Sequence, residues 1–116
     1  MAFPVLVGPF PLTPAGININ QLPRMSGAYC LGSIGSDGKF NAAYVGRADD
    51  DLAARLRQHI GSHSYDVFLY ALTSSPHDAF LMECQLYHRF APRDNTVHPT
   101  RPANESWTCP SCGRGS

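Results

Sequence analysis

The sequence predicts a small α/β (α+β) domain in which helices flank a mostly antiparallel three-stranded sheet. Apolar runs with strand composition occupy residues 27–34, 40–46 and 65–73. A turn signal separates the first two runs, and a segment with helical periodicity follows each of the last two. The 116 residues are enough for one domain with a core and too few for two comfortable ones.

Composition limits the function classes. Hydrophobic residues make up 43% of the chain and charged residues 16%, as in a folded globular protein. Nine basic and nine acidic residues cancel, so nucleic-acid binding would need a local basic patch. The apolar start of the chain is interrupted by Pro4, Pro9 and Pro11 and has no basic residue before it, unlike a signal peptide or a membrane span. We therefore expect an intracellular, cytoplasmic protein with no membrane partner.

Residues 1–25 are rich in Pro and Gly and predict an extended arm with room for one short edge strand. The run 27–34 is the first strand of the core. Asp37-Gly38 lies between two apolar runs and indicates a hairpin, with 40–46 as the returning strand.

The hairpin register decides where two tyrosines point. A two-residue loop pairs Tyr29 with Gly46 and Leu31 with Tyr44, so Tyr29 and Tyr44 project from one face as diagonal neighbours. A four-residue loop would pair the tyrosines directly, whereas a three-residue loop would send them to opposite faces.

A helix should follow the hairpin. Asp49 or Asp50 can cap its start and Gly61 can end it. At about 100° per residue, Arg55 and His59 fall near the apolar side and should look toward the body of the protein. The buried stripe comprises Leu52, Leu56 and Ile60.

A second helix begins after the third strand. Ser75 suits the N-cap, Pro76 the first turn and Asp78 the capping box, and the helix should end near Phe90, before Pro92. Its apolar stripe contains Ala79, Leu86 and Phe90, with Glu83 in the middle. A buried carboxylate is expensive, so Glu83 should be ion-paired, protonated or bound to a metal.

Each of these polar residues has an ordinary explanation when taken alone. Strand tyrosines usually pack, and an Arg and a His four residues apart are usually a surface charge and a satisfied core histidine. Together, in this order, they are similar to the GIY-YIG nuclease superfamily. Gly27-Ala28-Tyr29 and Tyr44-Val45-Gly46 resemble the two halves of its signature, followed by Arg55, His59, Glu83 and Asn95.

The resemblance covers residues 23–99, and Leu22-Pro23 resembles the approach to this motif in the repair-nuclease branch. Ala28 and Val45 replace isoleucines that only pack, and Arg47 stands where many members have lysine. For a second downstream aromatic or histidine, both His63 and Tyr65 remain open. We expect residues 26–99 to form the nuclease-like domain and 100–116 an irregular tail.

The resemblance implies a metal-dependent endonuclease that hydrolyses DNA phosphodiesters, with structure-selective or weak sequence specificity. The expected catalytic set is Tyr29, Tyr44, Arg55, His59, Glu83 and Asn95. Glu83 would bind Mg²⁺ or Mn²⁺, and Tyr29 would act as general base with help from the metal, a cation or His59. Asn95 is expected to hold the site together. The expected DNA contacts are Gly46, Arg47 and Arg57, and branched or damaged DNA is a candidate partner. The alternative function is an inactive module of this fold that binds nucleic acid or protein.

The tail contains a Cys-x-x-Cys pair, Cys109 and Cys112, that resembles half of a zinc ribbon. A structural zinc ion would need further ligands such as His98, Cys84 or His88, or ligands from another chain. We expect instead a disordered tail with incidental cysteines, and solvent-exposed or structural roles for His77, His88 and His98. A zinc-binding interaction protein organised by the tail is a third reading.

Overall fold

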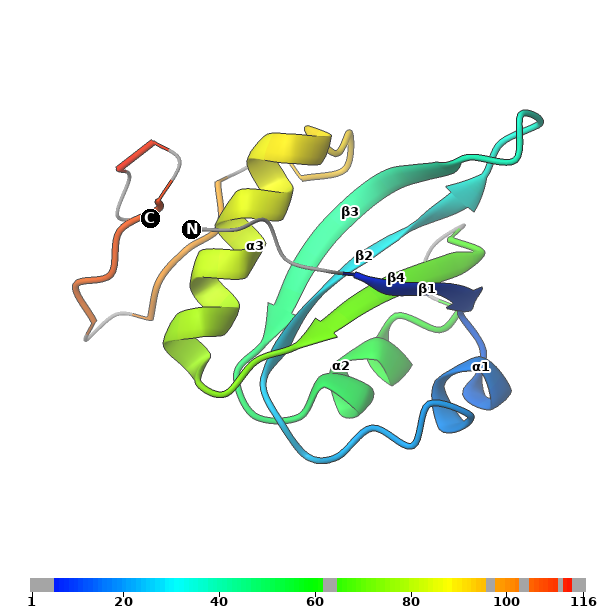
Figure 1. Cartoon of the computed structure of the whole chain (residues 1–116), viewed down its shortest axis with the longest axis horizontal. Helices are drawn as coiled ribbons and strands as arrows, with labels where there is room; N and C mark the ends of the chain where they lie inside the picture. Colours follow the sequence, from blue (N-terminus) through cyan, green and yellow to red (C-terminus); the bar gives the residue numbers. More distant parts are fainter. Residues whose placement is uncertain (1–5, 62–64, 96–97, 103–104, 111, 114–116) are drawn as a thin grey trace.

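The computed structural model describes residues 6–61, 65–95, 98–102, 105–110 and 112–113. Its centre is a fully antiparallel four-stranded sheet with the strand order β1-β4-β2-β3 (Figure 1). The strands are β1 (Val7–Pro11), β2 (Gly27–Ile34), β3 (Phe40–Ala48) and β4 (Val67–Leu72). The helices are α1 (Pro14–Asn18), α2 (Leu52–Gln58) and α3 (Pro76–Phe90).

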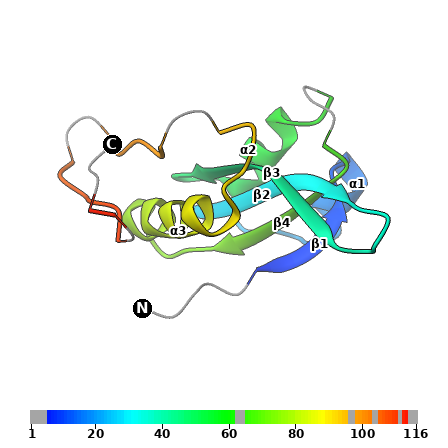
Figure 2. The same cartoon turned by 90° about the horizontal axis from the view of Figure 1, so that it is seen from above.

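The helices divide between the two faces of the sheet (Figure 2). α1 and α2 cover one face over a core that includes Tyr29, Leu52 and Phe68. α3 packs on the other face, over a smaller cluster formed by Ala28, Cys30, Val45 and Leu86. The predicted antiparallel α+β class is therefore confirmed.

The sheet has one strand more than the three predicted for the core, and the fourth is the short edge strand for which the N-terminal arm had room. The N-terminal arm supplies β1, which pairs with β4 at one edge, and then forms the short helix α1. Thr13 caps α1 by accepting a hydrogen bond from the Gly16 amide, a signal that the Pro- and Gly-rich composition obscured. β4 lies between β1 and β2 and runs antiparallel to both.

The hairpin reaches the predicted register by a different route. Gly35 and Lys39 pair next to the turn, which leaves a three-residue loop with Gly38 at φ 80°. That loop alone would place the two tyrosines on opposite faces. A bulge between Leu31 and Gly32 restores the register, so Tyr29 pairs with Gly46 as predicted.

Helix boundaries follow the capping residues closely. Ser75 caps α3 through its side chain, as predicted, and Ala91 ends the helix in the left-handed region before Pro92. For α2 the prediction was wrong: the N-cap is Asp51, whose carboxylate accepts from the Ala54 amide, and neither Asp49 nor Asp50. Among the described residues, no helix has the length and apolar character required to cross a bilayer.

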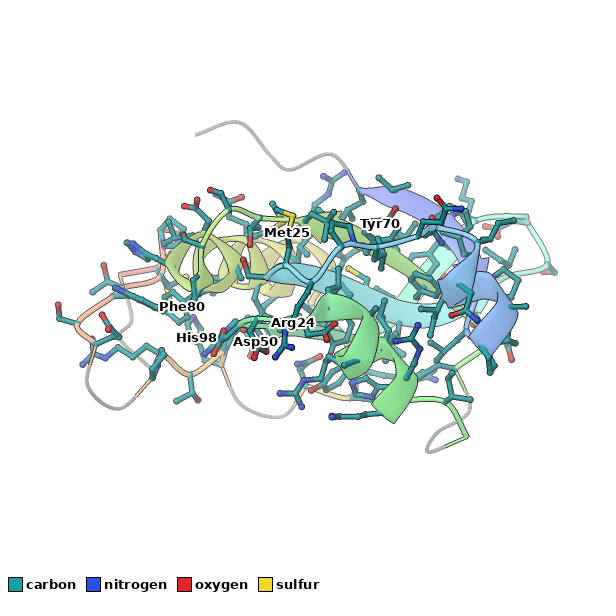
Figure 3. The ribbon with its side chains drawn as sticks, turned by 90° about the horizontal axis from the view of Figure 1, so that it is seen from below. Arg24, Met25, Asp50, Tyr70, Phe80 and His98 are labelled. Carbon is teal, nitrogen blue, oxygen red and sulfur yellow. The ribbon has the colours of Figure 1, made fainter. Side chains whose placement is uncertain are left out.

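The described part of the tail has no helix or strand but packs on α3. Cys109 is buried against Phe80 and Cys84, and the Trp107 ring lies 4.7 Å from His77, centroid to centroid. Figure 3 shows Phe80 and His98 at the α3 end of the molecule, away from Tyr70. The expectation of a disordered tail is therefore wrong for these residues.

Candidate functional site

The core of the candidate site is a hydrogen bond between Tyr29 and His59. Tyr29 Oη lies 2.7 Å from His59 Nε2, which joins β2 to the C-terminal cap of α2. Tyr29 is 1% exposed. Burial, followed by the nearby Tyr44 and Glu83, raises the pKa of Tyr29, while Arg55 opposes the rise. The phenol is therefore neutral at physiological pH, with its oxygen held against an imidazole nitrogen.

An aromatic row extends from this pair. The ring centroid of Tyr44 lies 5.4 Å from that of His59, and 6.4 Å from those of both Tyr29 and Tyr65. Burial raises the pKa of Tyr44, with a further contribution from Glu83 and opposition from Arg55. The two tyrosines thus share a face with His59, as the hairpin register predicts.

Glu83 enters the site from α3. Its Oε1 accepts a 2.7 Å hydrogen bond from Arg47 Nη1, and Arg47 Nε donates to Asp49 at 3.0 Å. Burial raises the pKa of Glu83, and the hydrogen bond and charge of Arg47 offset part of that rise. For Arg47, burial acts to lower the pKa, but the hydrogen bond and charge of Glu83 reverse the sign and raise it. The predicted pairing of a buried Glu83 is present, and Arg47 is its partner.

The tyrosines, Glu83 and Arg55 line one cavity of about 680 Å³ along β3. Arg55 itself is exposed and sits at the rim, where Nη1 donates to Gln58 Oε1 at 3.2 Å. Its predicted inward orientation is thus only partly realised. The remaining lining residues are Gly46, Arg47, Asp49, Asp50, Pro76 and Thr100.

A divalent cation suits this cavity chemically. Arg47 donates to Oε1 of Glu83, which leaves the second carboxylate oxygen, Oε2, for another partner. Among the described residues no side-chain oxygen is both buried and without a hydrogen bond, so Oε2 is accessible, and Glu83 lines the cavity. Mg²⁺ typically takes one or two protein carboxylates and completes its shell with water and phosphate oxygens. Glu83 meets that requirement, and Asp49 and Asp50 add carboxylates to the lining.

Asn95 holds the outer edge of β3. Its side-chain amide accepts from Val45 N at 2.8 Å and donates to Val45 O at 2.9 Å, as a neighbouring strand would. Val45 lies between Tyr44 and Gly46, so Asn95 fixes the backbone of the second half-motif. This position matches the structural role expected for Asn95.

Two residues expected to contact DNA have other neighbours. A Cβ built on Gly46 would lie 2.5 Å from Tyr29 Oη, so glycine at this position makes room for the tyrosine ring. Arg57 points away from the cavity lining and donates from Nη2 to Asn18 at 2.9 Å. His63 lies outside the described residues, whereas Tyr65 donates to Asp94 at 2.7 Å.

The sequence prediction missed several lining residues. Asp49 and Asp50 were assigned to helix capping, and Thr100 was assigned to the irregular tail. The two aspartates are ambiguous in the sequence, because acidic residues at the start of a helix also suit capping. No local pattern marks Thr100, which the path of the tail brings to the cavity.

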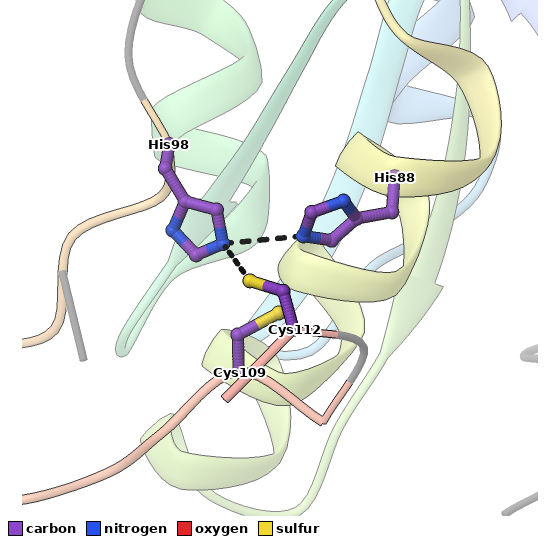
Figure 4. Close-up of side chains that lie close together, drawn as sticks. All are labelled: His88, His98, Cys109 and Cys112. Carbon is purple, nitrogen blue, oxygen red and sulfur yellow. Dashed lines mark hydrogen bonds between the residues drawn. The ribbon is translucent and has the colours of Figure 1, made fainter. Parts of the chain in front are cut away.

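A second cluster lies on the far end of α3. The side chains of His88, His98, Cys109 and Cys112 converge, with their ligand atoms all within 4.8 Å of one another (Figure 4). His98 is buried, and its Nε2 lies 3.3 Å from His88 Nε2 and 3.5 Å from Cys112 Sγ. Two of the three histidines for which solvent-exposed or structural roles are predicted, His88 and His98, thus face the cysteine pair.

Comparison with known proteins supports the fold. No protein-family model and no curated protein sequence matches the chain. One solved structure does: the GIY-YIG N-terminal endonuclease domain of UvrC from Thermotoga maritima, bound to its catalytic divalent cation, magnesium. The match has a TM-score of 0.54 and 22% identity, and it covers 69% of this chain and 96% of that one. The chain has a GIY-YIG fold.

The match extends over most of the UvrC domain and over part of this chain. Nearly the whole UvrC domain corresponds to about two thirds of this chain. Within that fold, β2 and β3 carry the two half-motifs, His59 is the C-cap of α2, and Glu83 lies on α3. The fold expected from the sequence resemblance and the fold of the structural match therefore agree.

Proposed function

We propose that this protein is a metal-dependent nuclease that hydrolyses phosphodiester bonds in DNA. The observation that carries the proposal is the 2.7 Å hydrogen bond from Tyr29, which lines the same cavity as Glu83, to His59 behind it. Tyr29 can accept a proton from water and pass its own to His59, while Glu83 can hold a metal ion and Arg55 can bind phosphate oxygens. These groups together suit in-line hydrolysis of a phosphodiester. The match to a magnesium-bound endonuclease domain adds support.

Tyr29 would remove the proton from the attacking water. A buried phenol with a raised pKa stays protonated, so its own proton must leave as the water proton arrives. His59 Nε2 is placed to receive it, provided that His59 is neutral with its proton on Nδ1. The water oxygen then bonds to phosphorus as the opposite phosphorus–oxygen bond breaks.

Other residues of the cavity lining would stabilise the negative charge of the phosphate and hold the metal ion. Arg55, at the rim of the cavity, is placed to neutralise charge on the phosphoryl oxygens, and Tyr44 can donate a hydrogen bond beside it. Glu83 would hold Mg²⁺ or Mn²⁺, and the bound ion would supply Lewis-acid stabilisation of the phosphate and of the leaving oxygen. Arg47 would orient Glu83 through the hydrogen bond between them.

The proposed substrate is DNA selected by its structure or with little sequence preference. The chain is electrically neutral overall, and the two arginines that line the cavity, Arg47 and Arg55, are accompanied there by Asp49, Asp50 and Glu83. Such a surface offers weak non-specific attraction to phosphates. Selection would then rest on the fit of a distorted or branched backbone to the cavity.

The test is cleavage of labelled duplex, single-stranded and branched DNA with Mg²⁺, Mn²⁺ or EDTA. Wild type should give products only with metal, and Glu83→Gln should give none, because the amide removes the negative charge that holds the cation. Glu105→Gln, which changes the exposed tail glutamate in the same way, should match wild type. Cleavage by a folded Glu83→Gln variant at the wild-type rate would overturn the proposal.

A second candidate is a module that binds nucleic acid without cutting it. The observation in its favour is the Arg47–Glu83 ion pair, whose side chains are 14% and 10% exposed, since a cation has to compete with Arg47 for the carboxylate. This reading predicts retention of labelled DNA in a gel-shift assay by wild type and Glu83→Gln alike, with no products from either. The cleavage assay therefore separates the two functions.

A further inference from the structure

We propose that His88, His98, Cys109 and Cys112 bind one structural Zn²⁺ ion that fixes the C-terminal tail to α3. Two imidazoles and two thiols form a ligand set that zinc prefers in closed structural sites. The set differs from the carboxylates offered in the cavity, so the two sites would take chemically different cations. The matched UvrC domain corresponds to 69% of this chain, and nothing in that likeness assigns a metal to the tail.

The spacing of the ligand atoms fits a tetrahedral ion. With zinc–nitrogen bonds of about 2.05 Å and zinc–sulfur bonds of about 2.3 Å, tetrahedral angles place two nitrogens about 3.3 Å apart and a nitrogen and a sulfur about 3.6 Å apart. The corresponding distances are 3.3 Å from His88 Nε2 to His98 Nε2 and 3.5 Å from Cys112 Sγ to His98 Nε2. All four ligand atoms lie within 4.8 Å of one another, Cys109 included.

The tautomer of His98 is also set for metal binding. Its Nδ1 lies 2.9 Å from the carbonyl oxygen of Pro99, which can only accept, so Nδ1 carries the proton. Nε2 of a neutral His98 then has a lone pair that points at His88 and Cys112 (Figure 4). A ligating histidine commonly donates its other N–H to a carbonyl in this way.

A hydrogen bond and a left-handed glycine next to the two cysteines are typical of a metal-binding turn. The Gly113 amide donates to the Cys109 carbonyl at 2.8 Å, and Gly113 has φ 74°. Such a turn brings both sulfurs of a Cys-x-x-Cys pair to one side. Cys84, on α3, is hydrogen-bonded to Cys109 and completely buried, so we assign it to the packing around the site and not to the ligands.

Zinc at this position would connect the tail to the candidate active site. His88 belongs to α3, the helix that carries Glu83, and Thr100, two residues after His98, lines the cavity. Arg101 donates to the Trp107 carbonyl at 3.0 Å, and Trp107 packs on Phe80 with ring centroids 5.8 Å apart. The ion would thereby hold this segment against α3. This consequence for activity rests on the proposed nuclease function, whereas the zinc site itself does not.

The experiment measures metal content of the full chain purified under reducing conditions and dialysed against buffer with a trace of Zn²⁺. Wild type should contain about one zinc ion per chain. Cys112→Ser and His98→Ala should each lose most of it, and Cys30→Ala, which alters a buried cysteine of the sheet core, should retain it. Cys112 is exposed, so its replacement should leave the fold intact, which circular dichroism checks.

Cobalt substitution gives a second readout that does not depend on activity. Co²⁺-loaded wild type should show the visible absorption of a tetrahedral ion with thiolate ligands, and Cys112→Ser should not. Zinc-free wild type under these conditions, zinc retained by a folded Cys112→Ser/His98→Ala double variant, or a Cys109–Cys112 disulfide in place of metal would each overturn the proposal. A zinc-containing protein that cuts no DNA would support the zinc site and overturn only the nuclease.

Discussion

The strand-borne site, which is the part of the candidate site formed by Tyr29 and Tyr44, and the tail cluster around Cys109 and Cys112 are organised by different forces. Tyr29 and Tyr44 are positioned by backbone pairing between β2 and β3 and by packing under α2. The residues of the tail cluster are held by side-chain contacts to α3, with no strand or helix in the described tail. A cooperative core therefore fixes the first site whether or not a ligand is bound. The tail cluster would depend on four ligand atoms that hold the proposed zinc ion. Removing one of these ligands should therefore loosen the tail and leave the sheet intact.

The substitution Tyr29→Phe tests this contrast most directly, because it should strongly reduce the rate of DNA cleavage without disturbing the core. Removal of the hydroxyl leaves the buried ring in place but deletes the proton path to His59. We expect metal-dependent cleavage to fall by about 10²–10⁴-fold, the usual contribution of a general base. Single-turnover cleavage rates measure the effect.

Tyr70→Phe is the matched control for that variant. Tyr70 is the cross-strand partner of Tyr29 on β4, is also buried, and donates its hydroxyl to Asn20 at 3.1 Å. Its loss should cost a similar amount of stability, about 1 kcal/mol, with cleavage unchanged. Equal losses of activity in both variants would mean that the hydroxyl of Tyr29 matters only for packing.

Asn95→Ala tests the junction between the two regions, with a smaller effect. The variant loses both hydrogen bonds to the Val45 backbone at the edge of β3, which should lower the free energy of unfolding by about 1–3 kcal/mol. Cleavage should fall less than in Tyr29→Phe, because the edge of the strand loosens while the reacting groups remain. Chemical denaturation and cleavage rates measure the two effects.

Asn20→Ala provides the comparison, since Asn20 also makes two side-chain hydrogen bonds, one to the Gly16 carbonyl and one from Tyr70. It should be destabilised comparably while cutting at the wild-type rate. If both asparagine variants lose stability and neither loses activity, Asn95 has no part in shaping the site.

The strand-borne site could be predicted from sequence because its determinants are local. Ser75, Pro76 and the apolar stripe define α3, and Asp37-Gly38 defines the hairpin. The prediction that Tyr29 and Tyr44 share a face is correct only because two deviations from the expected hairpin cancel. A three-residue loop shifts the register by one, and the bulge at Gly32 shifts it back. Gly32 permits the bulge because a Cβ there would collide with the Asn41 carbonyl.

The missed features depend on contacts that are distant in sequence. The composition of residues 1–25 allows one edge strand but does not locate it, because Gly and Pro hide strand character and the partner strand β4 is about 60 residues away. The tail cluster combines His88 on a helix with Cys112 in an irregular segment, and no periodicity connects them. Arg47 likewise gives no sign in the sequence that its partner is Glu83.

The smallest predicted effect concerns the pH dependence of stability. Burial raises the pKa of Glu83 above its ordinary value, with partial opposition from Arg47, so the folded state binds this proton more tightly than the unfolded state. The resulting stabilisation is fully present below the ordinary glutamate pKa of about 4.3 and is lost as pH rises through the higher folded-state value. Glu83→Gln has no such ionisation, and the other titrating groups are common to both proteins. In metal-free buffer, the free energy of unfolding of wild type minus that of the variant should therefore decrease from pH 4 toward neutrality.

Denaturant titrations at several pH values, with EDTA present, measure that difference. If this difference in the free energy of unfolding rises with pH, the charge of Arg47 outweighs burial and keeps Glu83 ionised. The Arg47–Glu83 ion pair would then be the stable state of the site, which favours the binding module. Added Mg²⁺ should reverse the decline near neutral pH in wild type alone, since a cation bound to the Glu83 carboxylate stabilises the folded state that carries it. The same titration of Glu105→Gln should follow wild type throughout, because that carboxylate is exposed. Stability and metal binding at one buried carboxylate can thus be measured without any nucleic acid present.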